Sequence, residues 1–234
     1  MSKSSIGARL MLITYLWVKV HAFNTFVNLP NPFNALITER RDGSIDAKKE
    51  FLDSLDSVNS FNPASKTRTN LLDTMTNFNP TEKPGSTSSF LPIAPGTWKI
   101  VYAPHISTLS GLINGSFNPV IYDMKKDGMT IVSHAKYNFP ILGEGWLSVS
   151  GTYGTEDNDT RCRVDFEHAW IRIGAENWAS YNDAPNTWYK GPINELGKLG
   201  FRKEFAVFPV SYLDKDTIVF DFELFGTRIC ARKM

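Results

Sequence analysis

The fold of this chain is decided by the stretch Gly96-Thr97-Trp98-Lys99-Ile100-Val101-Tyr102. A glycine turn leads into Trp98, after which apolar and polar positions alternate: Trp98, Ile100 and Tyr102 share one face, and Lys99 lies on the other. Alternation with a period of two residues is typical of a half-buried strand. Residues before this stretch show helical and loop patterns, whereas most residues after it show strand and turn patterns. The stretch is therefore predicted to be the first strand of an antiparallel β-domain.

About eight strands are predicted from Trp98 onward, separated by turns rich in Gly, Asn and Asp. The clearest covers residues 161–170, where one face carries Cys162, Val164, Phe166, His168 and Trp170. Short, evenly spaced strands indicate a barrel or a sandwich, and the Gly-x-Trp opening resembles the first strand of lipocalin-like barrels. The predicted fold is mainly β: an antiparallel lipocalin-like barrel of about eight strands, preceded by two short α-helices.

The barrel is assigned to residues 92–234 and is preceded by a helical pair and a linker. Residues 44–80 carry apolar side chains at three- and four-residue spacing, typical of two amphipathic helices. Such helices cannot bury their apolar stripes alone, so they are expected to pack on the barrel, most simply at one end. Residues 81–91 form a Pro/Ser/Gly-rich linker.

One stretch within the barrel, residues 174–200, has no persistent period and is predicted to be a long loop or lid. It carries four aromatic residues: Trp178, Tyr181, Trp188 and Tyr189. Exposed Trp and Tyr favour a boundary between water and an apolar phase, which predicts a membrane-contact loop. The alternative, weighed equally, is that these rings fold back as a secondary core.

The first 43 residues resemble targeting sequence. Residues 1–22 have a positive start, an apolar run and small or aliphatic residues before a cleavage point, as a signal peptide does. Residues 23–43 form a flexible, acid-poor leader that begins with Phe23. This order resembles the bipartite plastid-targeting leaders of algae with secondary plastids, and the alternative is secretion.

Composition narrows the function classes. The chain has 16 Phe, 8 Tyr and 6 Trp, which favours a wide apolar interior or an apolar ligand surface. The formal net charge is +1 and no Lys/Arg run is interleaved with aromatics, so no nucleic-acid partner is expected. The two cysteines, Cys162 and Cys230, are too few for a disulfide framework and are expected to be free thiols, with a single bridge as the alternative.

Several motifs occur in an order that is itself recognisable. They are Phe51-Leu52-x-x-Leu55, Arg68-x-x-Leu71-Leu72, Asn79-Pro80-Thr81, Gly96-Thr97-Trp98-x-x-Val101-Tyr102 and Tyr212-Leu213-Asp214-x-Asp216. Together they resemble the plastid lipid-associated protein (fibrillin) family over residues 44–233. The resemblance implies a lipocalin-like barrel in the plastid, at thylakoid or lipid-droplet surfaces, that shelters carotenoids, quinones or prenyl lipids. One departure is that family members commonly place an Arg-Gly pair in the strand after the Leu-Asp motif, where this chain reads Ile218-Val219-Phe220-Asp221-Phe222.

The inward positions of the strands define the predicted ligand site. An eight-stranded barrel has just enough interior to hold one small ligand. The predicted lining comprises Trp98, Ile100, Tyr102, Val164, Phe166, His168, Ile218, Phe220 and Phe222. The lipocalin resemblance further implies that Arg228 or Arg232 stacks on Trp98 and closes the barrel floor. The alternative is a barrel filled by its own side chains.

No catalytic motif is recognisable, and three scattered histidines (His105, His134 and His168) lack a metal-binding spacing, so no cofactor or metal is expected. The leading hypothesis is therefore a non-enzymatic protein that binds apolar lipids or pigments at a membrane or droplet surface. A second hypothesis is an isomerase or cyclase acting inside the barrel, with His168 transferring the proton. A third is a scaffold for prenyl-lipid enzymes.

Overall fold

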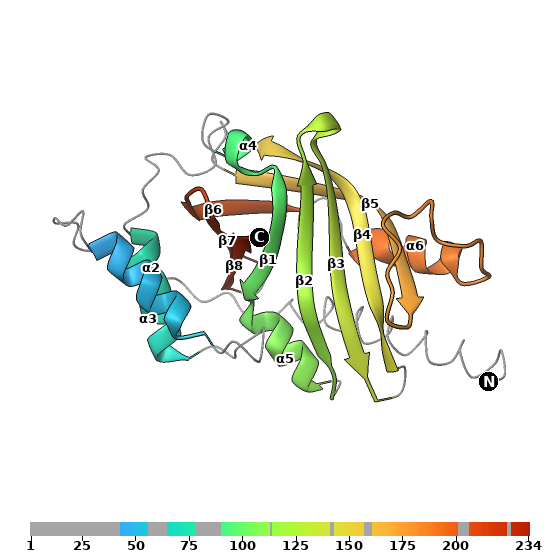
Figure 1. The fold of residues 1–234 in the computed structure, drawn as a ribbon, viewed down its shortest axis with the longest axis horizontal. Coiled ribbons are helices and arrows are strands. Elements are labelled where there is room, and N and C mark those ends of the chain that lie inside the picture. Colours follow the sequence, from blue (N-terminus) through green and yellow to red (C-terminus); the bar gives the residue numbers. More distant parts are fainter. Residues whose placement is uncertain are drawn as a thin grey trace.

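The computed structural model describes residues 43–55, 65–77, 90–112, 114–140, 143–156, 161–200, 206–223 and 226–234. In this part of the chain eight antiparallel strands form a closed barrel, in which each strand pairs with the next and β8 returns to β1 (Figure 1). The predicted antiparallel barrel is thereby confirmed. Its strands are β1 (Gly96–Tyr102), β2 (Ser116–Lys125), β3 (Thr130–Phe139), β4 (Gly143–Glu156), β5 (Arg161–Ile173), β6 (Val207–Leu213), β7 (Thr217–Phe222) and β8 (Thr227–Lys233).

Two helices, α2 (Gly43–Asp53) and α3 (Lys66–Asn77), pack on the outer wall of the barrel rather than at an end. Phe51 and Met75 are fully buried against outward-facing residues of β1, β6, β7 and β8. Tyr102 is one of these residues, because a shift in the β1–β8 register after Ile100 turns it outward. Its ring meets Phe51 edge to face at 5.5 Å between centroids. The register shift thus supplies the aromatic surface on which the helix pair rests.

The remaining helices lie at the ends of the strands. The short helix α4 (Phe90–Ile93) precedes β1, α5 (Pro104–Leu112) follows it, and the 3-10 turn η2 (Asp127–Met129) joins β2 to β3. The linker predicted over 81–91 is therefore wrong at its end, because Phe90 is a fully buried core residue. The predicted targeting sequence, apart from Gly43, and residues 78–89 lie outside the described residues. None of the described helices is long and apolar enough to span a membrane.

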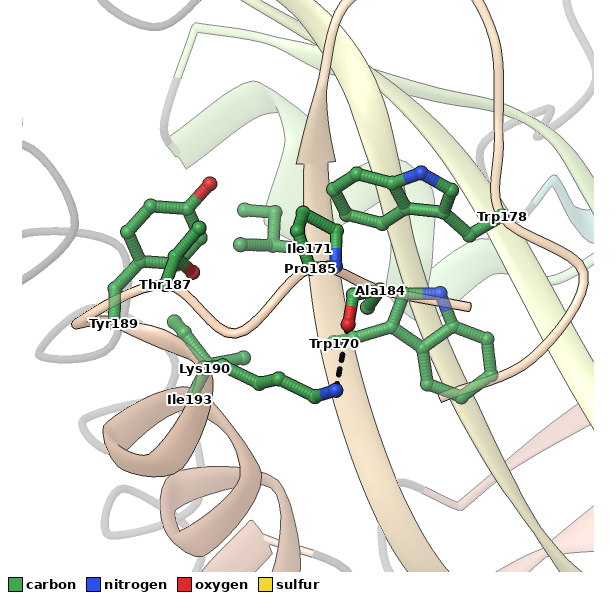
Figure 2. A pocket seen from close by; sticks show the side chains of 9 residues that line it. All are labelled: Trp170, Ile171, Trp178, Ala184, Pro185, Thr187, Tyr189, Lys190 and Ile193. Atoms are coloured by element: carbon green, nitrogen blue, oxygen red, sulfur yellow. Dashed lines mark hydrogen bonds between the residues drawn. The ribbon is translucent and has the colours of Figure 1, made fainter. Parts of the chain in front are cut away.

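Helix α6 (Lys190–Gly200) occupies the second part of the predicted loop. It lies beside β5 beyond the β5–β6 ladder, which among the described residues pairs Arg161–Arg163 with β6 and ends where the N–H of Val164 bonds to the carbonyl of Ala206. There Ile193 of α6 packs with Ile171 of β5, two residues labelled in Figure 2. The side-chain oxygen of Asn194 accepts a 3.0 Å hydrogen bond from the backbone N–H of Ala169. The helix therefore packs along this part of the strand and satisfies a donor on it.

A charged cluster ties α2 to the turn between β6 and β7. The ammonium of Lys48 lies 2.7 Å from a carboxylate oxygen of Asp214 and also pairs with Asp216. Burial opposes the charged form of Asp216, but hydrogen bonds from Lys48 and Thr217 outweigh it and hold its pKa well below the usual range. The hydroxyl of Tyr212 donates to Asp214 at 2.8 Å. The Leu-Asp motif thus has a structural role here: it anchors the helix pair.

Replacing Lys48 with Met is expected to lower the free energy of unfolding at pH 7 by about 1–3 kcal/mol, because charged hydrogen bonds are lost. A carboxyl pKa lowered by folding contributes stability above its unfolded value of about 4, and that contribution disappears as the pH falls further. The difference in free energy of unfolding between wild type and Lys48→Met should therefore become smaller below about pH 4. Urea unfolding between pH 3 and 7 measures this, with the exposed neighbour Lys49→Met as control; a gap independent of pH would contradict it.

Candidate functional site

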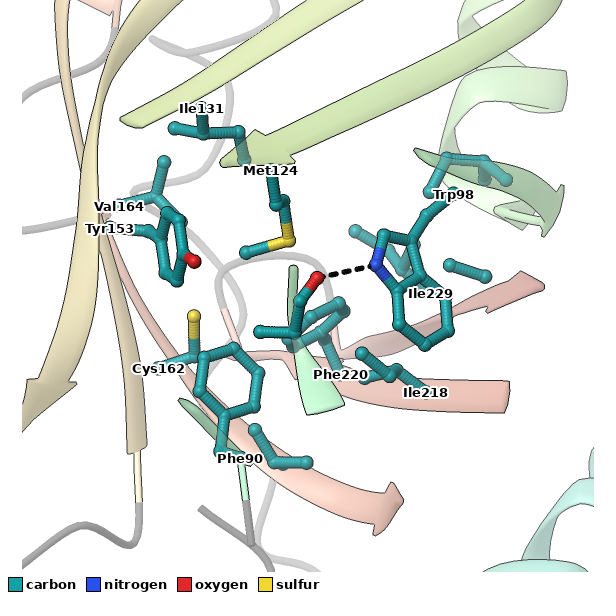
Figure 3. Close-up of a cluster of buried hydrophobic side chains, with 14 of the residues drawn as sticks. Phe90, Trp98, Met124, Ile131, Tyr153, Cys162, Val164, Ile218, Phe220 and Ile229 are labelled. Atoms are coloured by element: carbon teal, nitrogen blue, oxygen red, sulfur yellow. Dashed lines mark hydrogen bonds between the residues drawn. The ribbon is translucent and has the colours of Figure 1, made fainter. Parts of the chain in front are cut away.

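The interior of the barrel divides into two parts. One part, here called the sealed half, is filled by side chains that are at most 8% exposed. Figure 3 shows how they converge, with Phe90 of α4 lying among residues from the strands. The labelled members of the sealed half are Phe90, Trp98, Met124, Ile131, Tyr153, Cys162, Val164, Ile218, Phe220 and Ile229. Close packing of this kind leaves no space for a ligand between these side chains.

Trp98 closes the sealed half. Its indole N–H donates a 2.7 Å hydrogen bond to the carbonyl of Ala94, drawn in Figure 3. The ammonium of Lys233 lies 5.0 Å from the centroid of the ring and donates to the carbonyl of Ile93. The predicted cation–π closure therefore exists, but with a different residue. Arg228 instead pairs with Asp73 and Asp221, and Arg232 is exposed.

The other part, the accessible half, comprises inward-facing residues that retain intermediate exposure although they pack on the core. They are Phe117, Tyr122, Ala135, Phe166, Phe208 and Phe222. The ring of Phe208 lies 5.7 Å from that of Phe222, between centroids, and 6.3 Å from that of Phe220 in the sealed half. A surface of aromatic rings that is inside the barrel and still accessible suits an apolar ligand.

His105 of α5 lies beside this surface. Its ring is 4.9 Å from that of Phe222, and its Nδ1 is 3.3 Å from the hydroxyl oxygen of Thr227. Burial lowers the pKa of His105 to about 4, so the imidazole is neutral at physiological pH. The accessible half is therefore bordered by a neutral polar group.

Two hydroxyls face the interior from neighbouring strands. Tyr122 of β2 is the register partner of Ser133 of β3 and of Trp98 of β1, so it lies where the two halves meet. Burial raises the pKa of Tyr122 to about 12, to which the nearby Cys162 adds, yet the side chain keeps accessible surface. A tyrosine that is deep in the fold and still accessible borders internal space. Its hydroxyl stays protonated and can donate a hydrogen bond.

The predicted lining residues separate into three groups. Trp98, Ile100, Val164, Ile218 and Phe220 face inward, as expected, but are buried in the core. Phe166 and Phe222 belong to the accessible half. Tyr102 and His168 face the outside, which corrects their assignment to the ligand site.

A β-bulge explains the position of His168. The β4–β5 register shifts between Ser150 and Gly151, which leaves Glu167 without a partner and reverses the faces of the residues that follow. His168 is exposed and stacks on Tyr181 at 4.6 Å between centroids, while the buried Trp170 lies on the same outer face. The proton-transfer residue of the enzymatic hypothesis is therefore outside the barrel.

The loop from Gly174 to Tyr189 folds back over this outer face, so the alternative of a secondary core describes most of its rings. Arg172 lies 4.6 Å above the ring of Trp178, and Lys190 lies 4.4 Å above that of Tyr181. Tyr189 instead packs beside Ile171, on the inner face of β5. Trp188 differs because its side chain is 57% exposed.

A small pocket with a cavity volume of about 10 Å³ lies between this loop, α6 and the edge of β5 (Figure 2). The indole N–H of Trp170, which lines it, is buried and has no hydrogen-bond partner in the structure as described.

Polar residues near the loop satisfy one another. His134 Nδ1 is 2.8 Å from the hydroxyl of Ser148 and 2.7 Å from the amide nitrogen of Asn177. Burial lowers the pKa of His134. Over the described ranges, no group of three or more His, Cys, Asp or Glu is placed to hold a metal ion. Both Cys162 and Cys230 are free and buried, Cys162 in the interior and Cys230 beneath the helix pair.

The sequence patterns did not identify Tyr122, Ser133 and His105 as site residues. In β2 the run Val120-Ile121-Tyr122 is apolar on both faces, so alternation alone did not assign Tyr122 to the interior. Its inward direction could have been predicted from its pairing with Trp98, which follows once β1 and β2 are placed as antiparallel neighbours. Ser133 could then have been placed by its alternation with Ile131 and Ala135.

Comparison of the chain with protein-family models, with curated proteins and with solved structures found no match. The resemblance to plastid lipid-associated proteins therefore stays a prediction from the motifs.

The packing of α6 against β5 can be tested by substitution of Gly197. A Cβ atom there would overlap the Cβ of Ala169, so Gly197→Ala is expected to destabilise the protein by about 1–3 kcal/mol despite the higher helix propensity of alanine. Adding Ala169→Gly should restore most of the loss. Gly191→Ala, where a Cβ meets nothing within 4 Å, is the matched control. Thermal unfolding of the wild type, the single variants Gly197→Ala, Ala169→Gly and Gly191→Ala, and the double variant measures this; additive effects in the double variant would disprove the contact.

Proposed function

We propose that this protein binds an apolar small molecule in the accessible half of its barrel. The observation that supports this most is the contrast within the interior: one end is packed solid, whereas the aromatic rings of Phe166, Phe208 and Phe222 stay accessible. Each Å² of apolar surface that a ligand removes from water there contributes about 25 cal/mol to binding.

The class of ligand follows from this surface. A molecule that buries about 300 Å² of its own apolar surface would gain roughly 7 kcal/mol before the entropic cost of binding. Carotenoids, quinones and prenyl lipids have such surfaces. They are also the ligands implied by the motif resemblance, which further suggests a plastid location at thylakoid or lipid-droplet surfaces. Secretion is the alternative, and a role beside prenyl-lipid enzymes is compatible with the same site.

Carriage is preferred to catalysis for a specific reason. The enzymatic hypothesis needed His168 inside the barrel, and the bulge in β5 places it outside. The polar groups that do border the accessible half, Tyr122 and His105, are both held neutral by burial. Neutral groups suit binding of an uncharged molecule.

Filling the accessible half is the direct test of ligand binding. Ala135→Phe adds a ring to this half, so it should reduce the affinity for ubiquinone-type and carotenoid probes at least tenfold. Quenching of tryptophan fluorescence by the probe measures the affinity. Ile173→Phe, at a 44% exposed position, is the matched control and should bind as wild type does. Mass spectrometry of lipids that co-purify from the native host identifies the ligand. Equal binding by Ala135→Phe and wild type would contradict the proposal.

Contact with an apolar surface is proposed for Trp188 alone among the four loop rings, because it is the exposed one. Trp188→Ser should lower partitioning onto phosphatidylcholine vesicles severalfold in flotation assays. Trp178→Ser, a ring already covered by Arg172, should partition as wild type does. Unchanged flotation of Trp188→Ser would reject the role of the loop.

A further inference from the structure

Most interior hydroxyl and indole groups are satisfied by the protein itself. Tyr153 donates to the carbonyl of Lys125 at 3.2 Å, and Tyr137 donates to that of Arg172 at 3.3 Å. Trp98 donates to Ala94. These bonds follow the general rule that a buried polar group finds a partner, because an unpaired one costs about 1–3 kcal/mol.

Tyr122 and Ser133 depart from this rule. They are direct register partners on β2 and β3 and both face the interior. In the ranges that the structure describes, neither hydroxyl has a hydrogen-bond partner, although Ser133 is only 9% exposed. Neither oxygen is among the fully enclosed, unpaired atoms, so each borders accessible space. Two unpaired hydroxyls on neighbouring strands are therefore available to a molecule that enters the barrel.

The surroundings restrict what that molecule can be. Among the described residues, the one titratable group that acts on the pKa of Tyr122 is Cys162. Cys162, which lies close enough to influence Tyr122, is kept as the neutral thiol because burial raises its pKa. A carboxylate or phosphate placed here would lack a counter-ion in an apolar interior, which is strongly unfavourable. A neutral oxygen avoids that cost.

We infer that the Tyr122–Ser133 pair binds the neutral oxygen of a ligand, a carbonyl or hydroxyl, whose apolar body lies along Phe166, Phe208 and Phe222. The barrel accordingly selects oxygenated apolar molecules over pure hydrocarbons and over acids. Tyr122 donates to the ligand oxygen, and Ser133 donates to or accepts from it. This inference rests on the proposed binding of an apolar molecule inside the barrel.

The test uses three probes of one chain length: hexadecane, 2-hexadecanone and hexadecanoic acid. Each competes with a fluorescent apolar reporter for the purified full chain. The ketone is expected to compete at least tenfold better than the other two. Tyr122→Phe should weaken ketone competition about five- to tenfold and leave hexadecane unchanged, and Ser133→Ala should act in the same direction.

Tyr153→Phe is the matched control, since that hydroxyl already bonds to a backbone carbonyl. It should preserve the preference for the ketone. Equal competition by ketone and hydrocarbon, or a preference that survives both Tyr122→Phe and Ser133→Ala, would overturn this inference and leave the proposed function standing. Failure of the reporter and all three probes to bind would overturn both.

Discussion

The structure depends on how Trp98 is held. Its indole N–H needs an acceptor once it is buried, and Ala94 supplies one from the end of the short helix α4. Its ring face carries the ammonium of Lys233, at the end of β8. One side chain thus connects α4, at the packed end of the barrel, with the first and last strands. Because α4 also brings Phe90 into the core, this end is packed solid, and any ligand must be bound elsewhere in the interior.

A second constraint acts in β5. The bulge at Glu167 reverses the faces of the strand, so that Ala169 and Ile171 face inward and His168 faces outward. Among the described residues, β6 accompanies β5 only as far as Val164, and beyond it the N–H of Ala169 bonds to Asn194 of α6 instead. Helix α6 covers this part of β5. Gly197 is required there because the helix approaches so closely that no side chain fits.

Sequence alone predicted what depends on unbroken alternation. The barrel, its strand-rich second half and the inward direction of Ile218 and Phe220 all follow from a period of two. The misplaced residues, Tyr102 and His168, each follow a register shift. A single inserted residue of this kind cannot be recognised from the alternation of apolar and polar residues. Helix α6 was missed because glycine and proline near its start weaken the helical pattern.

The accessible half could not be predicted because it depends on which polar groups the fold leaves unpaired. Among the described residues three tyrosines point into the barrel, and the sequence does not distinguish them. Tyr153 and Tyr137 reach backbone carbonyls at the strand ends, whereas the hydroxyl of Tyr122, opposite Trp98, has no such partner among the described residues. An interior hydroxyl that the protein leaves unpaired gives selectivity for a ligand oxygen a physical basis, while the surrounding rings supply affinity without discrimination.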